Sequence, residues 1–291
     1  MQRSIIEKTP YRQLAGSACF EPAVALRKVR FCLFALLILL ASHVVSCTTL
    51  AGFVRPQGIE HRFAKESFRS GDGIVFPYRL SSPVRIEDGQ QYPIVMLFHG
   101  AGERGSNNED RVLKHFLALV QRPDFRLDEV FVLALQCPED MRWVEVDWNL
   151  PSHRQPKQPS KPMAAVYELL HSLEASLPID TKRRYGIGLS MGGFAVWDVL
   201  SRWPDLLAAG VAVCGGGDEL AVLNIHAPVW VFHGSNDGLI NVERSRAMVR
   251  ALERLKKPWR YTEYAGEGHG SWLPAFQEKE LLTWMFSNQR P

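Results

Sequence analysis

The chain has 291 residues, a hydrophobic content of 46% and a formal net charge of +3, which is enough apolar material for one large domain or two small ones. The positive charge belongs to the first 46 residues, which hold six of the 34 Lys and Arg and two of the 31 Asp and Glu, so the remainder keeps 28 and 29 and a net charge of −1. No basic stripe remains that would argue for binding to nucleic acid, so we expect no nucleic acid partner.

Residues 1–46 have the pattern of an export signal. Arg27, Lys28 and Arg30 precede an apolar run over 31–45, and a small residue follows it, as in a signal peptide. A helix of 15 residues is about 22 Å long, which is shorter than a hydrocarbon core of about 30 Å. A signal peptide therefore fits better than a stable membrane span.

The end of this leader resembles a bacterial lipobox. Residues 44–47 read Val-Val-Ser-Cys, which favours Cys47 as the lipidated first residue of the mature protein over ordinary cleavage or an uncleaved anchor. We expect an exported protein, periplasmic or at the cell surface, whose contact with a membrane is limited to this lipid anchor. Residues 47–60 then read as a tether, and 61–291 as one folded domain.

A β-hairpin and a buried strand open this domain. Strand-like runs over 68–70 and 74–80 flank Gly71-Asp72-Gly73, and an Asp-Gly pair supplies the positive φ that tight turns need. Residues 92–98 are almost all apolar, which is typical of a strand buried on both faces. This strand leads into the loop His99-Gly100-Ala101-Gly102-Glu103-Arg104-Gly105.

The rest of the chain alternates strands and helices. A strand over 130–135 leads into a polar, proline-rich loop over 139–160, whose length indicates a functional loop. Ser160 is expected to cap a helix over 163–177. The later elements are strands over 208–214, 227–232 and 259–264 and helices over 241–256 and 274–287. This alternation predicts an α/β domain with a mostly parallel, twisted sheet and helices on both faces.

The motif Gly188-Leu189-Ser190-Met191-Gly192 ends a short apolar run and passes directly into a helix-like segment. A sharp strand-to-helix turn holds a serine hydroxyl clear of the backbone, where it can act as a nucleophile. Glycines flank the serine because a Cβ would collide in such a turn. The alternative is a glycine-rich turn with a solvated serine.

The chain order predicts the partners of Ser190, because working residues of parallel sheets collect after the carboxyl ends of strands. His269 is the histidine that lies downstream of both Ser190 and the strand expected to carry an acid, and glycines flank it. We prefer Asp237 as the acid over Asp218, since the acid usually follows the penultimate strand. These three residues form a candidate catalytic triad in the order Ser, Asp, His.

A serine triad predicts hydrolysis of a carboxylic ester through an acyl-enzyme. The oxyanion that forms during attack needs two donors, and we assign the amide of Met191 and one from the loop after residues 92–98, at Ala101 first and Gly102 next. Trp143 and Trp148 are candidates for the wall of a substrate pocket, although packing is an equally good role for either.

The cysteines give no sign of a metal or a disulfide framework. They lie at positions 19, 32, 47, 137 and 214, without a Cys-x-x-Cys pair or a Cys/His spacing typical of zinc. Cys137 and Cys214 end apolar runs and are expected to be buried thiols. We expect no metal and no cofactor.

Several motifs together resemble the α/β-hydrolases related to polyhydroxybutyrate depolymerases and feruloyl esterases, a group that includes phospholipase/carboxylesterase-type enzymes. The resemblance runs from about residue 65 to 288 and implies the α/β-hydrolase fold and serine hydrolysis of a small-molecule or polymer-derived ester. The motifs that carry it are His99 to Gly105, Gln136-Cys137-Pro138 with Trp143, Ile179-Asp180 with Arg184-Tyr185, Gly188 to Gly193, and Cys214-Gly215-Gly216-Gly217-Asp218.

The resemblance also implies a strand order in which the strands ending at Cys137 and Cys214 are three places apart. At about 4.8 Å per place the two cysteines are then about 14 Å apart, too far for a disulfide. The long loop over 151–162 and the lack of a recognisable polymer-binding module depart from the group's pattern and count against a polymer substrate.

Three other functions compete with the esterase. The first is a dinucleotide-dependent oxidoreductase, because the loop over residues 100–105 has the G-x-G-x-x-G form of a dinucleotide-binding motif. This motif follows a β-hairpin, however, and no acidic residue ends a second strand at the expected spacing. A non-catalytic surface-binding lipoprotein could use the same fold. A prolyl oligopeptidase-like peptidase would share the triad but normally carries an additional gating domain.

Overall fold

The computed structural model describes residues 58–291, which belong to one compact unit spanning Pro56–Pro291. The predicted signal peptide over 1–46, Cys47 and most of the predicted tether over 47–60 lie outside the described residues. Within the described residues, each helix is too short or too polar to cross a bilayer.

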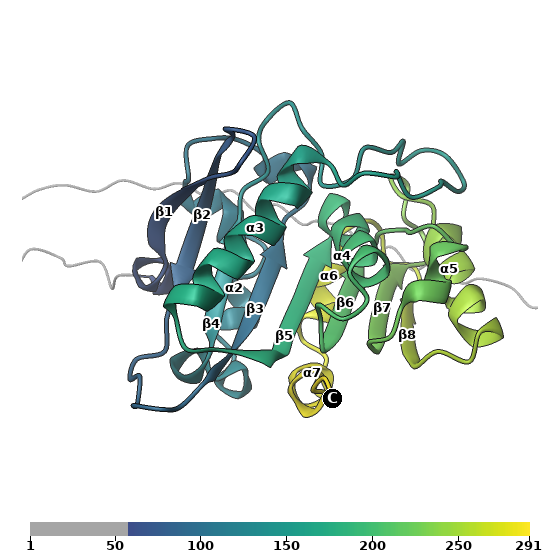
Figure 1. The fold of residues 1–291 in the computed structure, drawn as a ribbon. Helices are drawn as coiled ribbons and strands as arrows, with labels where there is room; N and C mark the ends of the chain where they lie inside the picture. The colour runs from purple at the N-terminus through teal and green to yellow at the C-terminus, as the bar shows by residue number, and fades with distance from the viewer. Residues whose placement is uncertain (1–57) are drawn as a thin grey trace, which may run out of the picture. The chain divides into compact units, whose positions relative to one another are not determined.

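A single eight-stranded sheet forms the centre of the domain, in the order β1-β2-β4-β3-β5-β6-β7-β8 (Figure 1). The first two strands pair antiparallel with their neighbours, and the six others run parallel. The strands are β1 (Ala64–Arg69), β2 (Val75–Ser81), β3 (Tyr92–Phe98), β4 (Phe131–Leu135), β5 (Ile179–Leu189), β6 (Ala209–Val213), β7 (Val229–Gly234) and β8 (Trp259–Tyr264).

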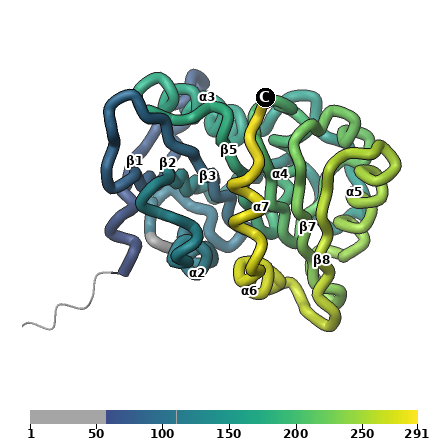
Figure 2. The backbone as a smooth tube through the Cα atoms, turned by 90° about the horizontal axis from the view of Figure 1, so that it is seen from below, coloured from purple at the N-terminus to yellow at the C-terminus, as the bar shows by residue number. Residues whose placement is uncertain are grey.

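Helices cover both faces of the sheet, as the alternating pattern predicts (Figure 2). One face packs against α3 (Lys161–Ser176), α4 (Met191–Arg202) and α5 (Glu243–Arg254). The other packs against α2 (Leu117–Val120), α6 (Trp272–Ala275) and α7 (Leu281–Ser287). Because both faces are covered, β3, β4, β6 and β7 are buried along their whole length, which explains their unbroken apolar sequences.

Most predicted elements are confirmed within two residues at each end. The hairpin pairs Ala64 with Leu80 through Arg69 with Val75, and the Ser160 hydroxyl caps α3 by accepting the Met163 amide at 3.2 Å. The strands that precede Cys137 and Cys214 are β4 and β6, three places apart. Both cysteines are buried free thiols, as predicted.

The predicted helix over 274–287 is wrong as a single element. The structure has two short helices there, α6 and α7, separated by residues 276–280. The Arg122 guanidinium donates to the carbonyls of Phe276 and Glu278, each at 2.8 Å. The Arg122 side chain, from a distant loop, thus occupies the Phe276 carbonyl at the position where α6 ends, while the Glu278 carbonyl also accepts the Leu281 amide at 3.2 Å.

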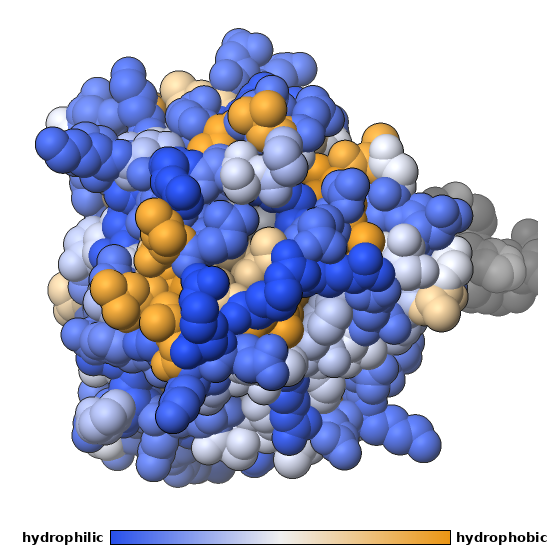
Figure 3. Space-filling model, turned by 90° about the vertical axis from the view of Figure 1, so that its right-hand side faces the viewer, coloured by the Kyte–Doolittle hydropathy of each residue, from blue (hydrophilic) through white to orange (hydrophobic). Residues whose placement is uncertain are grey.

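The β8 edge of the sheet is protected by charge. Arg260 on β8 pairs with Glu280 at 2.8 Å, and Glu263 pairs with Arg246 at 2.6 Å. At this end of the molecule polar side chains cover most of the surface, and apolar side chains form separate areas (Figure 3). Charged edge strands of this kind discourage pairing with another chain.

Backbone contacts around Ser190 determine the turn between β5 and α4. Ser190 has φ of 53° and ψ of −120°, a strained conformation for a residue with a side chain. A Cβ on Gly188 would lie 2.0 Å from the Gly192 oxygen, and a Cβ on Gly192 would lie 1.8 Å from the Phe98 oxygen. Only glycine fits at either position, which confirms the reason given for the G-x-S-x-G pattern.

Gly192→Ala should therefore lower the free energy of unfolding by at least about 2 kcal/mol, because the new methyl group forces the Phe98 backbone to move. Gly270→Ala is a matched control, since nothing lies within 4 Å of a Cβ there, and should change stability by less than about 0.5 kcal/mol. Urea unfolding followed by tryptophan fluorescence measures both. Equal stabilities for the two variants would show that the close contact does not constrain the turn.

Candidate active site

The three predicted triad residues meet above the carboxyl ends of the parallel strands. Ser190 directly follows β5, Asp237 follows β7, and His269 lies in the loop after β8. His269 Nε2 lies 2.8 Å from Ser190 Oγ, and His269 Nδ1 lies 2.7 Å from Asp237 Oδ2. Because a carboxylate accepts, Nδ1 carries the ring proton and Nε2 is free to accept the serine proton. This arrangement can generate a serine nucleophile.

The Asp237 carboxylate is fully buried but well supplied with donors. Oδ1 accepts the amides of Leu239 at 2.8 Å and Ile240 at 2.9 Å, and Oδ2 contacts His269 and, at 3.1 Å, His233 Nε2. Burial raises the pKa of this carboxyl, but the hydrogen bonds from His233, His269 and the two amides lower it by a larger amount. The pKa of Asp237 is therefore well below the ordinary carboxyl range. The carboxylate therefore stays ionised beside His269.

Asp218, the other acid considered from the sequence, has a different set of contacts. It accepts from Arg154 at 2.9 Å and from the amides of Gln155 at 2.9 Å and Leu220 at 3.0 Å. The structure thus brings Asp237 to the histidine and uses Asp218 to hold the 139–160 loop.

The predicted oxyanion-binding segments both lie beside Ser190. Met191 is the first residue of α4, so its amide has no acceptor within the helix. Ala101 and Gly102 line the same cavity as Ser190. Arg104 Nε donates to the Ala101 carbonyl at 3.0 Å, and Arg111 donates to the Gly102 carbonyl. Two arginines, which the sequence did not single out, therefore hold this loop by its carbonyl groups.

The side chain of His99 holds the start of the loop that carries Ala101 and Gly102. Its ring contacts the Gly100 carbonyl through Nδ1 at 2.6 Å and the Cys137 amide through Nε2 at 3.0 Å. Burial lowers the pKa of His99 to about 4, so Nδ1 donates to the carbonyl and Nε2 accepts from the amide. The ring thereby ties the end of β3 to the end of β4.

The assignment of Trp143 to the pocket wall is wrong. Its side chain is completely buried, packs edge-on against Phe76 and Phe98, and donates from Nε1 to the His99 carbonyl at 3.0 Å. The long loop folds this residue inward because its large ring fills the space under the oxyanion loop. Trp143 is a packing residue beneath the site.

A cavity of about 360 Å³ opens over Ser190. Trp148 lines it, as predicted. The full lining is Gly100, Ala101, Gly102, Glu103, His115, Trp148, Asn149, Leu189, Ser190, Leu239, Ile240, His269 and Trp272. Apolar and aromatic side chains predominate, which suits a small organic substrate more than a highly charged one.

A contact between a carboxylate and a histidine in this wall was not anticipated from the sequence. Glu103 Oε1 lies 3.2 Å from His115 Nε2, and the His115 ring packs 5.0 Å from that of Trp272. Burial raises the pKa of Glu103, and the contact and charge of His115 lower it by more, so the net shift is downward. His115 comes from a segment with no recognisable motif, so only the fold reveals that it reaches the cavity.

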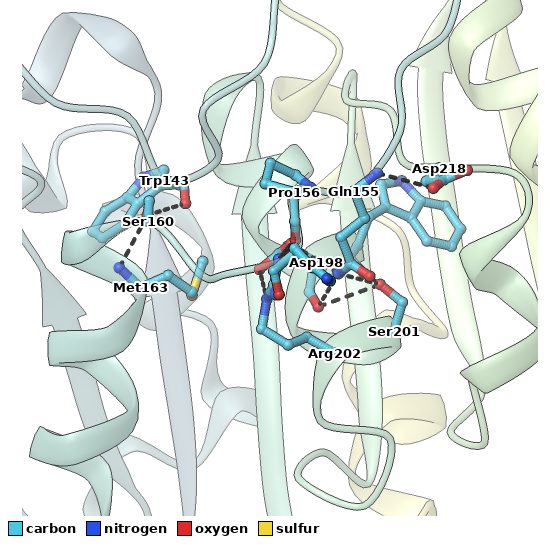
Figure 4. A network of polar contacts seen from close by, with 11 residues as sticks. Trp143, Gln155, Pro156, Ser160, Met163, Asp198, Ser201, Arg202 and Asp218 are labelled. Atoms are coloured by element: carbon cyan, nitrogen blue, oxygen red, sulfur yellow. Dashed lines mark hydrogen bonds and ion pairs between the residues drawn. The ribbon is translucent and has the colours of Figure 1, made fainter.

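The loop over 139–160, called the strap from here on, is tied to the domain by polar contacts at several points (Figure 4). Gln155 Nε2 donates to Asp198 Oδ1 at 2.8 Å and Ser201 Oγ at 2.9 Å, and Arg202 donates to the Pro156 carbonyl at 2.9 Å. Ser160 Oγ donates to the Trp143 carbonyl at 2.6 Å.

Arg244 on α5 holds the middle of the strap. Its buried guanidinium donates to the Leu150 carbonyl at 2.7 Å and to His153 Nδ1. Burial and the nearby Arg244 charge lower the pKa of His153 to about 4, which leaves its ring free to accept. Trp148 and Asn149, which line the cavity, lie just before these contacts, so the contacts hold the strap as part of the cavity wall.

Cys214 Sγ lies close to the triad, with its ligand atom and those of Asp237 and His269 all within 4.8 Å of one another. Burial raises the pKa of this thiol to about 12. Asp237 and His269 are already hydrogen-bonded to each other. The cluster is better explained by the triad than by a metal site.

Comparison with known proteins supports this fold. No protein-family model matches the chain. Over 95 residues it is 30% identical to a bifunctional acetylxylan esterase/xylanase from Neocallimastix patriciarum. The matched segment makes up 32% of this chain and 14% of that protein. A solved thermostable esterase is 34% identical with a TM-score of 0.71, over 80% of this chain and 64% of that one.

An acylaminoacyl peptidase from Pyrococcus horikoshii has a TM-score of 0.57 at 14% identity, over 78% of this chain and 42% of that chain. At this identity the likeness concerns the fold alone. The chain thus has the α/β-hydrolase fold, and it spans less than two thirds of the length of these relatives.

The strap contacts predict resistance to trypsin that depends on Gln155. Gln155→Ala removes the bonds to Asp198 and Ser201 and should speed cleavage after Arg154 or Lys157 about tenfold, the effect of losing about 1.4 kcal/mol of local stability. Gln158→Ala changes an exposed strap glutamine and should leave the rate unchanged. Mass spectrometry of the first fragments measures both rates. Rapid cleavage of the unmodified strap would mean that it opens readily.

Proposed function

We propose that this chain is a serine hydrolase that cleaves carboxylic esters through an acyl-enzyme on Ser190. The observation that carries the proposal is the continuous path from Ser190 Oγ through the His269 ring to Asp237, with contacts of 2.8 and 2.7 Å. The 34% identity to a thermostable esterase over 80% of this chain supports an ester substrate. The motifs of the sequence further support a place among polyhydroxybutyrate depolymerase and feruloyl esterase-like proteins.

The first step acylates the serine. His269 Nε2 takes the Ser190 proton as Oγ attacks the ester carbonyl carbon, and Asp237 stabilises the imidazolium that forms. The amides of Met191 and of Ala101 or Gly102 bind the carbonyl oxygen as it becomes negative. The tetrahedral intermediate then breaks its bond to the alcohol oxygen, which leaves with the proton from His269.

The second step regenerates the enzyme. His269 takes a proton from water as the water oxygen attacks the acyl carbon, and the bond from that carbon to Ser190 Oγ breaks. Oγ recovers its proton from His269, and the carboxylic acid departs. All proton transfers use groups of this chain, so the scheme requires no metal and no cofactor.

The cavity defines what the substrate can be. Its volume of about 360 Å³ lies near the lower end of the range for small-molecule sites, about 300–1,000 Å³. We therefore assign a small ester, or a short ester side group of a larger molecule, as the substrate.

Active-site labelling together with ester hydrolysis tests this function. The protein should bind one equivalent of a fluorophosphonate and hydrolyse short-chain p-nitrophenyl esters, and Ser190→Ala should abolish both. Asp237→Asn should lower kcat about 10³- to 10⁴-fold because the histidine tautomer is lost. Asp218→Asn, a matched control at the other candidate acid, should lower it less than tenfold.

Absence of labelling in a folded protein would contradict the proposal and favour a non-catalytic binding protein on the same fold. Hydrolysis of N-acylated peptides in preference to esters would instead favour a peptidase.

We also propose that the protein is exported and anchored by a lipid on Cys47. The support is the basic residues at 27, 28 and 30, the apolar run over 31–45 and the lipobox-like Val-Val-Ser-Cys at 44–47. In a bacterial host, the mature protein should begin at Cys47 and incorporate labelled palmitate, and Cys47→Ser should lose the label. Intact mass spectrometry provides the second readout. A mature species that begins before residue 31 would contradict both parts of the proposal.

A further inference from the structure

A second histidine contacts the acid of the triad. His233 lies on β7 near its end, and its side chain is fully buried. Its Nε2 lies 3.1 Å from Asp237 Oδ2, the same oxygen that His269 contacts, and 3.0 Å from the Ile240 carbonyl. Its Nδ1 lies 2.7 Å from Ser245 Oγ on α5. Both nitrogens of a completely buried ring are thus engaged, one of them at the candidate catalytic carboxylate.

The contacts define which nitrogen of His233 donates. Asp237 Oδ2 and the Ile240 carbonyl can only accept, so Nε2 carries a proton and shares it between them. Ser245 Oγ lies 2.7 Å from Nδ1 and 3.1 Å from the Gly215 carbonyl, and as a hydroxyl it can serve either neighbour. His233 is therefore a donor to the triad acid.

The carboxylate of Asp237 is held at both oxygens by this arrangement. The amides of Leu239 and Ile240 fix Oδ1, and the two imidazoles share Oδ2. Without His233, Oδ2 would have His269 as its one hydrogen-bonding side chain. Rotation of the carboxylate would then move Oδ2 away from the line to His269 Nδ1.

The same turn also holds the loop of His269. The Asn236 amide donates to the Glu267 carbonyl at 2.9 Å, and the Gly266 amide donates to Ser235 Oγ at 2.9 Å. A Cβ on Gly234 would lie 2.4 Å from the oxygens of Glu267 and Gly268. The turn after β7 therefore positions the acid through the His233 ring and the base through its backbone.

We propose that His233 is a positioning residue of the active site, which holds Asp237 Oδ2 toward His269 and shares the negative charge of the carboxylate. The inference rests on the proposed serine hydrolase function. By withdrawing charge from Oδ2, the second donor weakens the attraction between Asp237 and the His269 imidazolium. Loss of that donor should therefore favour the imidazolium and move the acidic limb of the kcat/KM profile to higher pH.

Other ionisable groups packed around this pair are balanced. On β8, Glu263 lies opposite His233 in the sheet and is paired with Arg246 of α5 through contacts of 2.9 and 2.6 Å. On the side of β6, Cys214 is a protonated thiol, and across the cavity Glu103 is paired with His115. Since Glu263 and Glu103 each have a partner of their own, Asp237, which contacts His269 directly, and His233, which contacts Asp237, remain the groups that act most directly on His269.

The test compares three variants with wild type across a pH series. His233→Phe keeps a buried ring without a donor and should lower kcat at least about tenfold, the equivalent of a charge-assisted hydrogen bond, with KM changed less than threefold. The acidic limb of its kcat/KM profile should move to higher pH. His233→Gln places an amide N–H near the position of Nε2 and should restore most of kcat and the original limb. His226→Phe is the control, since it makes the same change at an exposed histidine that contacts Asp205 outside the site and should leave kcat and the limb in place.

A folded His233→Phe with unchanged kcat and pH profile would overturn the proposal, and so would equal activities of the Phe and Gln variants. Should His233→Phe fail to fold, ring-nitrogen NMR of the unmodified protein decides, because it must show a proton on His233 Nε2. An unprotonated Nε2 would refute the role without any reference to activity. If the wild type neither labels nor hydrolyses esters, the proposed function fails, which is a distinct result.

Discussion

Close backbone contact between the first turn of α4 and the end of β3 is the constraint on which this site depends. Gly192 lies against the Phe98 carbonyl and Gly188 against that of Gly192, so β5 must turn abruptly into the helix at Ser190. The strained conformation of Ser190 costs about 1–3 kcal/mol. Eleven of the twelve residues of α4 are buried, and each large apolar side chain among them contributes about 1.5–3 kcal/mol. Packing of the helix therefore outweighs the strain and holds the serine in place.

Burial of the Asp237 carboxylate is the second costly feature. An isolated buried charge costs several kcal/mol, and here two amides and two imidazoles donate to the carboxylate. Because the folded-state pKa of this carboxyl is lowered, its contribution to stability is present above the ordinary carboxyl range and is lost as the pH falls through the folded-state value. The same bonds that make burial tolerable also orient the acid.

Three parts of the structure hold the oxyanion loop and the cavity wall in place. His99 ties the loop to the end of β4, Trp143 fills the space beneath it, and the strap carries Trp148 to the rim. A catalytic donor misplaced by a fraction of an ångström loses much of its effect, and one oxyanion donor is worth about 3 kcal/mol of activation energy. Rigid support from α3, α4 and α5 therefore matters as much as the identity of the loop residues.

The sequence by itself determined the sheet class, most element boundaries and the three triad residues. These follow from local patterns: apolar runs, glycines where a Cβ cannot fit, and the rule that working residues follow strand ends. It did not determine the inward turn of Trp143, the break after α6 at Arg122, the Glu103–His115 pair or the contact between His233 and Asp237. Each of these depends on which distant segments come into contact. The sequence alone does not distinguish a tryptophan that lines a pocket, such as Trp148, from one that packs in the core, such as Trp143. Only the tertiary structure decided them, because burial and hydrogen bonding between separate elements arise when the elements pack.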